Sequence, residues 1–224
     1  MTGGRTARAR AREDIAQEIA AEARRQLREQ GPHSLSLRSV ARALGFASSA
    51  LYRYFPSRDE LLTALIVQAL DALGDAVEAA DQGLGDGATR RARWTTACGA
   101  FRAWAKTNPA EYALIYGSPV PGYQAPRTTV APAMRLPRLL AAIAADAPDA
   151  FATPRLRDQI AVVARELGSP IAPGAMVTVT TAWAQLIGLV SAELFGQFTG
   201  PLAPADDLYA AAVEAQADAL GFAG

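Results

Sequence analysis

The sequence predicts an all-α protein with an N-terminal three-helix domain and a larger helical C-terminal domain. Apolar residues recur at spacings of three and four along most of the 224 residues, and no convincing alternating pattern of a strand occurs. Half of the residues are apolar, which suffices for one large core or two modest ones. We expect a flexible basic arm over residues 1–12, a helix-turn-helix domain over 13–60 and a helical domain over 61–224.

The first helix follows the arm. Its apolar stripe has a spacing of four and consists of Ile15, Ile19, Ala23 and Leu27. Gly31 and Pro32 then end the helix. A second, short helix begins after the capping residue Ser36 and carries the inward positions Leu37, Val40, Ala41 and Leu44.

The residues that follow predict a sharp turn between two short helices. Such helices cross steeply, so the contact position must be small, the turn must tolerate a positive φ, and the second helix must return an apolar residue to the core. Ala41, Gly45 and Leu51 meet these three needs, at separations of four and six residues. The segment therefore predicts a helix-turn-helix.

The second helix of this pair is expected over residues 47–55, before Pro56. It is too short to be stable alone. Its outward residues leave a slim N-terminal end and a polar, aromatic middle, which fits the major groove of DNA. They are Ser48, Ser49, Ala50, Tyr52, Arg53 and Tyr54. A capping box from Ser57 to Glu60 then predicts the start of a long helix that ends near residue 80.

Charge is distributed unevenly although the chain as a whole is neutral. Residues 1–60 hold 11 arginines against 7 acidic residues, a net charge of +4, and the remainder therefore carries −4. Four of these arginines, Arg5, Arg8, Arg10 and Arg12, lie in the expected arm. The arm is either a solvated tail or a segment that follows DNA phosphates or enters a minor groove.

The stretch "LSLRSVARALGFASSALYRYFPSRDELL" resembles the DNA-binding domain of the TetR family of bacterial transcriptional repressors, over roughly residues 13–62. The resemblance implies that Ser36, Tyr52 and Tyr54 contact phosphates and that Arg58 anchors the backbone. It also implies that Arg53 and residues 48–50 face base edges. The chain departs from the family at residues 47 and 48, which are Ala and Ser where the family often has Ser and Lys.

The DNA-binding candidates are Ser36, Arg38, Ser48, Ser49, Ala50, Tyr52, Arg53, Tyr54 and Arg58. An arginine can bind a guanine with two hydrogen bonds, which contributes about 1 to 3 kcal/mol of discrimination against other bases. The structural alternative for Tyr52 or Tyr54 is packing on the neighbouring helix.

The C-terminal part predicts four further helices before the last two. They lie over 90–107, around residues 112 and 116, over 124–145 and over 154–167, and three prolines interrupt the third of them. A helix over 173–198 is apolar on two sides and therefore needs two partners. Asp206 and Asp207 favour the start of a final, alanine-rich helix that permits close helix approach. The last two helices predict a homodimer with a four-helix interface, whose paired recognition helices would bind a palindromic double-stranded DNA operator.

The stretch "WAQLIGLVSAELFGQF" resembles a TetR-family C-terminal domain recognised by a Trp, a His and a Gly. Trp183 and Gly188 fit, and Ile187 stands where the His would be, so no histidine-based ligand role is carried over. The family resemblance implies a pocket for a small-molecule effector. The candidate lining residues are Trp94, Phe101, Trp104, Tyr112, Tyr116, Met134 and Trp183. Each has plain core packing as its alternative.

Other classes of function find little support in the sequence. His33 is the only histidine and Cys98 the only cysteine, which are too few residues for a histidine-based triad or a Cys/His zinc site. The sequence also contains no phosphate-binding loop motif. We therefore expect no enzyme activity, metal or cofactor. The most apolar window, 175–190, has about 16 residues against the roughly 20 of a membrane helix, so no membrane span is expected. The lone cysteine favours the cytoplasm. The alternative function is a helical protein–protein adaptor that does not bind DNA.

Overall fold

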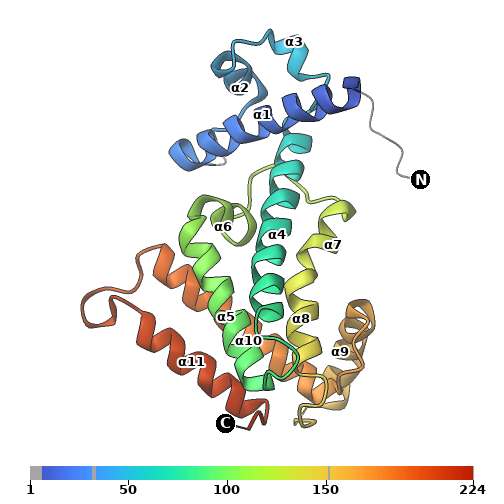
Figure 1. Cartoon of the computed structure of the whole chain (residues 1–224), viewed down its shortest axis with the longest axis vertical. Helices are drawn as coiled ribbons and strands as arrows, with labels where there is room; N and C mark the ends of the chain where they lie inside the picture. Colours follow the sequence, from blue (N-terminus) through green and yellow to red (C-terminus); the bar gives the residue numbers. More distant parts are fainter. Residues whose placement is uncertain (1–6, 32–33, 151, 224) are drawn as a thin grey trace. The chain divides into compact units, whose positions relative to one another are not determined.

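The computed structural model describes residues 7–31, 34–150 and 152–223, and within these ranges all regular structure is helical (Figure 1). This confirms the all-α prediction. The chain divides into two compact units. The first consists of residues 1–69 and 110–129, and the second of residues 70–109 and 130–224. Helix α4 runs continuously from the first unit into the second.

The first unit contains α1 (Ala7–Gln30), α2 (Leu37–Ala43), α3 (Ser48–Leu51), the start of α4 (Arg58–Gln82), most of α6 (Pro109–Tyr116) and the short η1 (Arg127–Thr129). The predicted stripe of α1 is confirmed for Ile19, Ala23 and Leu27, which are buried, whereas Ile15 is half-buried. The helix ends at Gly31, which has a φ of 74°.

Helix α1 begins earlier than the sequence analysis expected. Residues 7–12 continue the helix upstream, so the expectation of a flexible arm over 1–12 is wrong for this part. Alanine and arginine are strong helix formers, and no Gly or Pro interrupts the run from Ala7. Of the four arm arginines, Arg5 and the side chain of Arg8 lie outside the described part of the chain, whereas Arg10 and Arg12 are exposed on α1.

The helix-turn-helix is confirmed in its details. The Ser36 hydroxyl caps α2 by accepting a hydrogen bond from the Ser39 backbone N–H at 3.1 Å. Gly45 takes a φ of 70° just after α2, which an L side chain rarely adopts. Ala41 and Leu51 are fully buried. The small contact, the turn and the returning apolar residue therefore occur at the predicted positions.

Helix α3 is shorter than the predicted helix over 47–55. It covers only Ser48–Leu51, after which residues 52–54 form a tight turn. The Arg53 N–H donates to the Ala50 carbonyl and the Tyr54 N–H to the Leu51 carbonyl, and these three-residue spacings wind the chain more tightly than an α-helix. Pro56 disfavours helical geometry in the residue before it, which explains why the turn goes no further.

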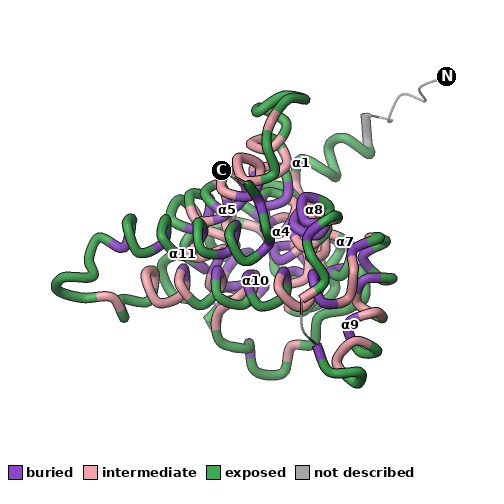
Figure 2. The backbone as a smooth tube through the Cα atoms, turned by 90° about the horizontal axis from the view of Figure 1, so that it is seen from below, coloured by how far each residue is buried: buried purple, intermediate pink, exposed green. Residues whose placement is uncertain are grey.

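The second unit is a helical bundle. It contains the rest of α4, then α5 (Arg90–Thr107), α7 (Val130–Ala133), α8 (Arg135–Ile143), α9 (Pro154–Leu167), α10 (Pro173–Leu194), η2 (Gly200–Leu202) and α11 (Asp206–Ala219). Its core includes Trp94, Phe101, Leu140, Leu186 and Val190, none of which is exposed. Figure 2 shows this burial along α5, α8 and α10, with the outer side of α11 exposed.

Helix bounds in this unit agree with the sequence analysis for α9 and for the start of α11. The predicted helix over 173–198 ends sooner, at Leu194, because Gly196 adopts a φ of 71° and stops it. The predicted stretch 124–145 is divided into η1, α7 and α8.

Arginine side chains of α5 hold α10 and α11. Arg102 donates two hydrogen bonds of 2.7 Å to Glu193 on α10 and one of 2.8 Å to Asp206 on α11. These contacts lower the pKa of Glu193, chiefly through the Arg102 hydrogen bonds. The Tyr209 hydroxyl of α11 donates to the Cys98 carbonyl of α5 at 2.8 Å.

One helix of the described chain, α10, is long and apolar enough to cross a membrane, with a mean hydropathy of 1.5 over its 18-residue window. Only 33% of that window is buried. A core helix of a soluble protein passes the same test, so the finding is weak evidence for a membrane span.

Candidate nucleic-acid interface

A shallow groove of about 400 Å³ lies on the first unit, beside the helix-turn-helix. It brings four of the nine DNA-binding candidates together, namely Ser36, Arg38, Tyr52 and Arg58. Leu37, Pro56 and Ser57 complete its wall. Hydroxyl groups and guanidinium groups at one groove are the donors that contact phosphate oxygens in protein–DNA complexes.

Two of these groove residues are held by contacts within the chain. The Arg58 Nε–H donates to the Leu35 carbonyl at 2.9 Å, which fixes the guanidinium at the start of α4. The Ser36 hydroxyl group caps α2 and also donates to the Ser39 hydroxyl at 3.0 Å. Ser39 in turn donates to Gln26 on α1 at 2.7 Å, so the cap also ties α2 to α1.

The segment of α3 and the following turn carries the other five candidates. Ser48, Ser49 and Arg53 are exposed, while Ala50 and Tyr54 are half-buried. Tyr52 is 45% exposed, which excludes a fully packed role for its ring. The exposed surface of the segment therefore carries small side chains at the start of α3 and larger polar and aromatic side chains in the turn that follows.

Arg12 on α1 contacts the turn that follows α3, a role that the sequence analysis missed. Its Nη2 donates to the Arg53 carbonyl at 3.1 Å, and its guanidinium lies 5.9 Å from the centre of the Tyr54 ring. The N-terminal extension of α1 thus supports the carbonyl end of a helix that is too short to be stable alone. The sequence held no signal for this contact, because the two segments are 41 residues apart.

We expect Arg12→Ala to weaken DNA binding about fivefold for each subunit bound, since a hydrogen bond and a cation–π contact that order the turn contribute about 1 kcal/mol. The measurement is a DNA titration by fluorescence anisotropy at several salt concentrations. Loss of a positioning contact leaves the salt dependence unchanged, whereas loss of a phosphate contact makes it shallower. Arg10→Ala, which removes another exposed arginine of α1, is the control. A shallower salt dependence for Arg12→Ala would contradict the positioning role.

The effector candidates fall in both units. Tyr112 and Tyr116 belong to the first unit, where their ring centres are 5.2 Å apart, and burial raises the pKa of the Tyr116 hydroxyl. In the second unit, Phe101 packs edge-on against Trp183 at 5.1 Å, and Trp94 packs edge-on against Phe222 at 6.1 Å.

None of the seven effector candidates lines the groove on the first unit or either of two pockets on the second. Trp94, Phe101, Trp104 and Tyr112 are buried, while Tyr116, Met134 and Trp183 are half-buried. The indole N–H of Trp94 is buried without a hydrogen-bond acceptor. The candidates thus have packing roles in the structure, and their effector role stays a prediction.

Other chemistry finds no built site in the described residues. No three His, Cys, Asp or Glu side chains lie close enough there to hold a metal ion. Cys98 is buried, and burial raises the pKa of its thiol, which makes it a poor nucleophile. His33 lies outside the described residues.

Comparison with known proteins shows the family of the chain. Residues 19–65 match the model of bacterial regulatory proteins of the tetR family, and residues 94–216 match that of a tetracyclin repressor-like C-terminal domain. The HTH-type transcriptional regulator Rv1816 of Mycobacterium tuberculosis is 41% identical over 204 residues, which cover 84% of each chain. A regulator of Mycobacterium bovis, Mb1846, shows the same identity and coverage.

Solved structures of other proteins are similar to this chain in fold. A crystal structure described as that of a regulatory protein, SCO4313, is 32% identical, covers 94% of this chain and 98% of its own, and has a TM-score of 0.80. The TetR-family regulator PfmR of Thermus thermophilus is similar in fold, with 20% identity, coverage of 90% and 98%, and a TM-score of 0.56.

The fold and the exposed α3 segment thus define a helix-turn-helix transcriptional regulator, a class of DNA-binding proteins. Within that class, the chain belongs to the TetR family, which the sequence motif had indicated. The members of this family are transcriptional regulators.

Proposed function

We propose that the protein is a ligand-responsive transcriptional repressor that binds a palindromic operator as a homodimer in the cytoplasm. The α3 segment enters the major groove, and Arg53 with residues 48–50 reads base edges. Ser36, Arg38, Tyr52, Tyr54 and Arg58 contact phosphates. The subunits associate through α10 and α11.

The observation that carries this proposal is the exposure of the α3 segment on a helix-turn-helix whose Ala41 and Leu51 are fully buried. Arg53 and Tyr52 are exposed, while Leu51 at the end of α3 is fully buried. A surface that held Tyr52 and Arg53 inside the protein could not meet a DNA groove. The groove beside it supplies two further cations, on Arg38 and Arg58.

Repression and effector response follow from a population shift. A small molecule that binds the DNA-incompetent arrangement more tightly than the competent one moves the equilibrium by that difference in affinity.

The test of this function is Arg53→Ala. We expect the variant to lose about 1 to 3 kcal/mol of operator binding at each half-site and to accept more sequences, because a bidentate arginine–guanine contact is removed from each subunit. The measurement is selection of bound fragments from random duplexes, followed by titration of the selected sites.

Arg155→Ala is the matched control, since Arg155 is an exposed arginine on α9 in the second unit. It should leave both affinity and sequence preference unchanged. If Arg53→Ala keeps the preference of the unchanged protein, Arg53 does not read bases.

A further inference from the structure

Gln216 on α11 is a buried side chain whose hydrogen bonding is incomplete. It is only 5% exposed. Its Nε2 donates to the Gln185 side-chain oxygen at 2.9 Å and to the Ala182 carbonyl at 3.4 Å, so both hydrogens have acceptors on α10. Its carbonyl oxygen Oε1 is buried and accepts no hydrogen bond from the described residues. Native proteins retain few buried polar atoms of this kind, so the oxygen points to a partner from outside the chain.

The Ala182 carbonyl fixes which way the Gln216 amide faces. If the amide were turned over, its oxygen would lie against this carbonyl, and two acceptors would face each other without a hydrogen between them. The amide therefore presents its N–H groups to α10, and its oxygen is the atom that lacks a partner. A molecule that completes the hydrogen bonding of this residue must bring a donor.

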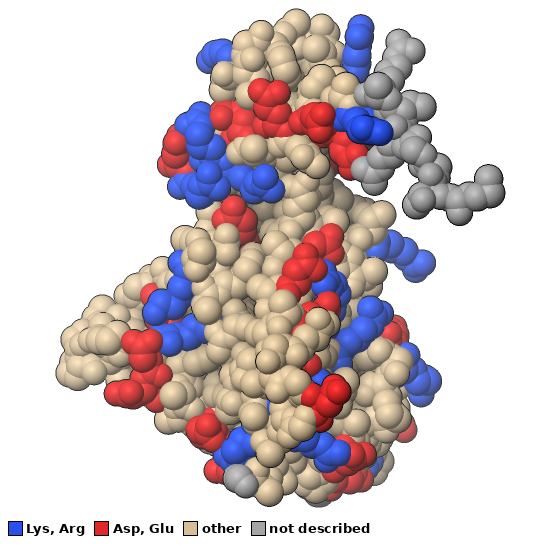
Figure 3. All heavy atoms as spheres, viewed as in Figure 1, with Lys and Arg blue, Asp and Glu red and all other residues tan. Residues whose placement is uncertain are grey.

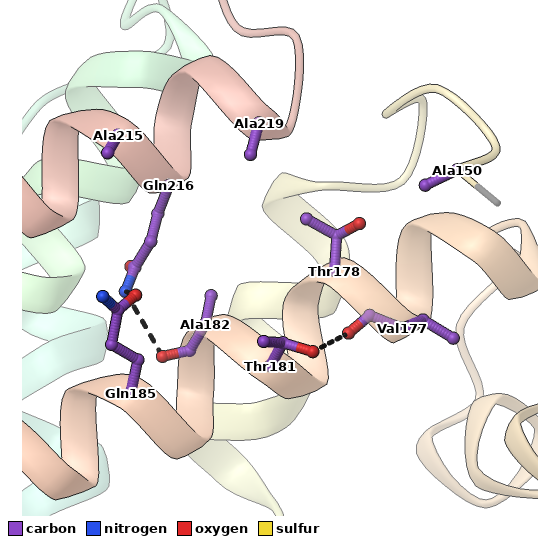
Figure 4. Close-up of a pocket in the computed structure, with 9 residues that line it drawn as sticks. All are labelled: Ala150, Val177, Thr178, Thr181, Ala182, Gln185, Ala215, Gln216 and Ala219. Carbon is purple, nitrogen blue, oxygen red and sulfur yellow. Dashed lines mark hydrogen bonds between the residues drawn. The ribbon is translucent and has the colours of Figure 1, made fainter. Parts of the chain in front are cut away.

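Both glutamines line a pocket of about 290 Å³ between α10 and α11 (Figure 4). In this view Gln216 extends from α11 toward α10, and Gln185 points back toward it. Alanine, valine and threonine side chains form the rest of the wall. An engineered apolar cavity of about 150 Å³ holds benzene. A pocket of about twice that volume therefore has room for a molecule of two fused rings.

The threonines at the pocket also present acceptors. The Thr181 hydroxyl donates to the Val177 carbonyl at 2.9 Å. The Thr178 hydroxyl donates to the Gly174 carbonyl at 3.3 Å. Both hydrogens are thus used within α10, whereas the hydroxyl oxygens keep lone pairs for other donors. The one remaining donor group among the lining side chains is the NH₂ group of Gln185, which is exposed. The pocket therefore favours a ligand that donates hydrogen bonds.

The pocket carries no charge, because none of its nine lining residues is acidic or basic. Carboxylates that are close to it in sequence are paired with arginines. Asp149 accepts from Arg157 at 2.8 Å, and both Glu214 and Asp218 pair with Arg91 of α5. Figure 3 shows the loop between α10 and α11 as an uncharged surface as well. A charged ligand would lose its hydration here without gaining a charged partner, so a neutral ligand is expected.

We propose that the pocket between α10 and α11 binds a neutral small molecule of two-ring size that donates an N–H or O–H hydrogen bond to the Gln216 oxygen. The apolar body of this ligand fits the alanine and valine walls, and its donor completes a buried acceptor that the chain leaves unpaired. The site is separate from the seven aromatic and methionine candidates, none of which lines this pocket. The proposal goes beyond the proposed function, which assigns no ligand chemistry.

A ligand explains the unpaired oxygen better than a second copy of the chain does, although the proposed subunit contact also uses α10 and α11. A second copy would bring the same lining side chains, whose hydroxyl hydrogens are already used within α10. Apart from the Gln185 amide, it would repeat the excess of acceptors instead of supplying a donor. A small molecule with one donor corrects this excess directly.

Indole and benzofuran test the donor in the full-length protein. The two probes have the same two-ring size, but only indole has an N–H group. Side-chain amide signals of protein labelled with ¹⁵N-glutamine, followed by NMR during each titration, report binding at Gln185 and Gln216. We expect indole to bind about tenfold more tightly than benzofuran, because benzofuran brings no donor to the Gln216 oxygen.

Gln216→Met removes the oxygen and keeps an unbranched side chain of similar length. We expect this variant to bind the two probes about equally and to retain benzofuran binding, which an unfolded protein would not do. Gln159→Met, at an exposed position on α9, is the matched control and should keep the preference for indole.

A second pair of variants tests the location of the site. Ala215→Phe should weaken the binding of both probes about tenfold, because the ring fills the pocket from α11. Ala142→Phe, at an exposed position on α8, is its matched control and should leave both affinities unchanged. Circular dichroism verifies that each variant is folded.

The outcomes separate this inference from the proposed function. Equal affinity of the unchanged protein for the two probes overturns the proposal, as does binding of neither, which is the result expected if a second copy of the chain covers the pocket. A preference for indole that persists in Gln216→Met also overturns it, because the donor then binds elsewhere. Operator binding is measured by anisotropy on the same samples. Operator binding without probe binding sinks the ligand site and leaves the repressor intact, whereas probe binding without operator binding does the reverse.

Discussion

Raising the monovalent salt concentration from 50 to 200 mM is expected to lower operator affinity roughly a hundredfold. The groove beside the helix-turn-helix places Arg38 and Arg58 where phosphates are expected, which gives four cations in a dimer. Each neutralised phosphate contributes about −0.9 to the slope of log affinity against log salt, so four contribute a slope of about −3.6. Anisotropy titrations at four salt concentrations measure this slope.

Arg38→Ala gives the internal check, because it removes two cations from the dimer. Its slope should be shallower by about 1.8. Arg155→Ala, which changes charge by the same amount far along the sequence on α9, should keep the original slope. An affinity that does not change with salt would argue for the protein–protein adaptor and against a DNA-binding role.

Trp94→Ala is expected to lower the free energy of unfolding by about 3 to 5 kcal/mol, the usual loss when a large aromatic side chain is removed from a core. Trp94 is fully buried on α5, and its ring packs edge-on against Phe222 near the C-terminus. Urea unfolding followed by circular dichroism measures the loss.

Two companion variants test how the loss of stability depends on burial and ring size. Trp183→Ala should cost less, since Trp183 is only half-buried. Trp94→Phe keeps an aromatic ring and removes the indole N–H that has no acceptor. It should retain most of the stability. Full stability of Trp94→Ala would contradict the core role.

The helix-turn-helix could be predicted closely from sequence because its constraints are local. Ala41, Gly45 and Leu51 each meet a requirement of the turn itself, and all three occupy the expected environments. The cap of α2 by Ser36 and the start of α4 after Ser57 also depend on residues only three positions apart. Such short-range requirements leave few alternative structures for this segment.

The features that the sequence analysis did not predict depend on contacts between distant segments or on the local geometry that decides where a helix begins and ends. Helix α3 stops at Leu51 because the chain tightens before Pro56, although the apolar and polar pattern continues to residue 55. The arm was expected to be flexible because it has nothing to bury, yet its alanines and arginines extend α1. This extension brings Arg12 to the Arg53 carbonyl, which no local pattern indicates.

The second unit shows what periodicity does and does not reveal. The apolar spacing of α10 and the acidic start of α11 identified both helices. Periodicity does not say which residues of a core line a pocket, so the seven aromatic and methionine candidates could be named but not assigned. The Gln185–Gln216 contact joins residues 31 positions apart and becomes visible only when α10 and α11 are packed together.

The most direct test of the central claim is the mass of the complex on a duplex selected from a random library, measured by light scattering. The account predicts an inverted repeat whose half-sites lie about one helical turn, roughly 10 base pairs, or a multiple of it apart, with two chains bound symmetrically. A library that yields no enriched sequence, or a complex that holds a single chain, would contradict it.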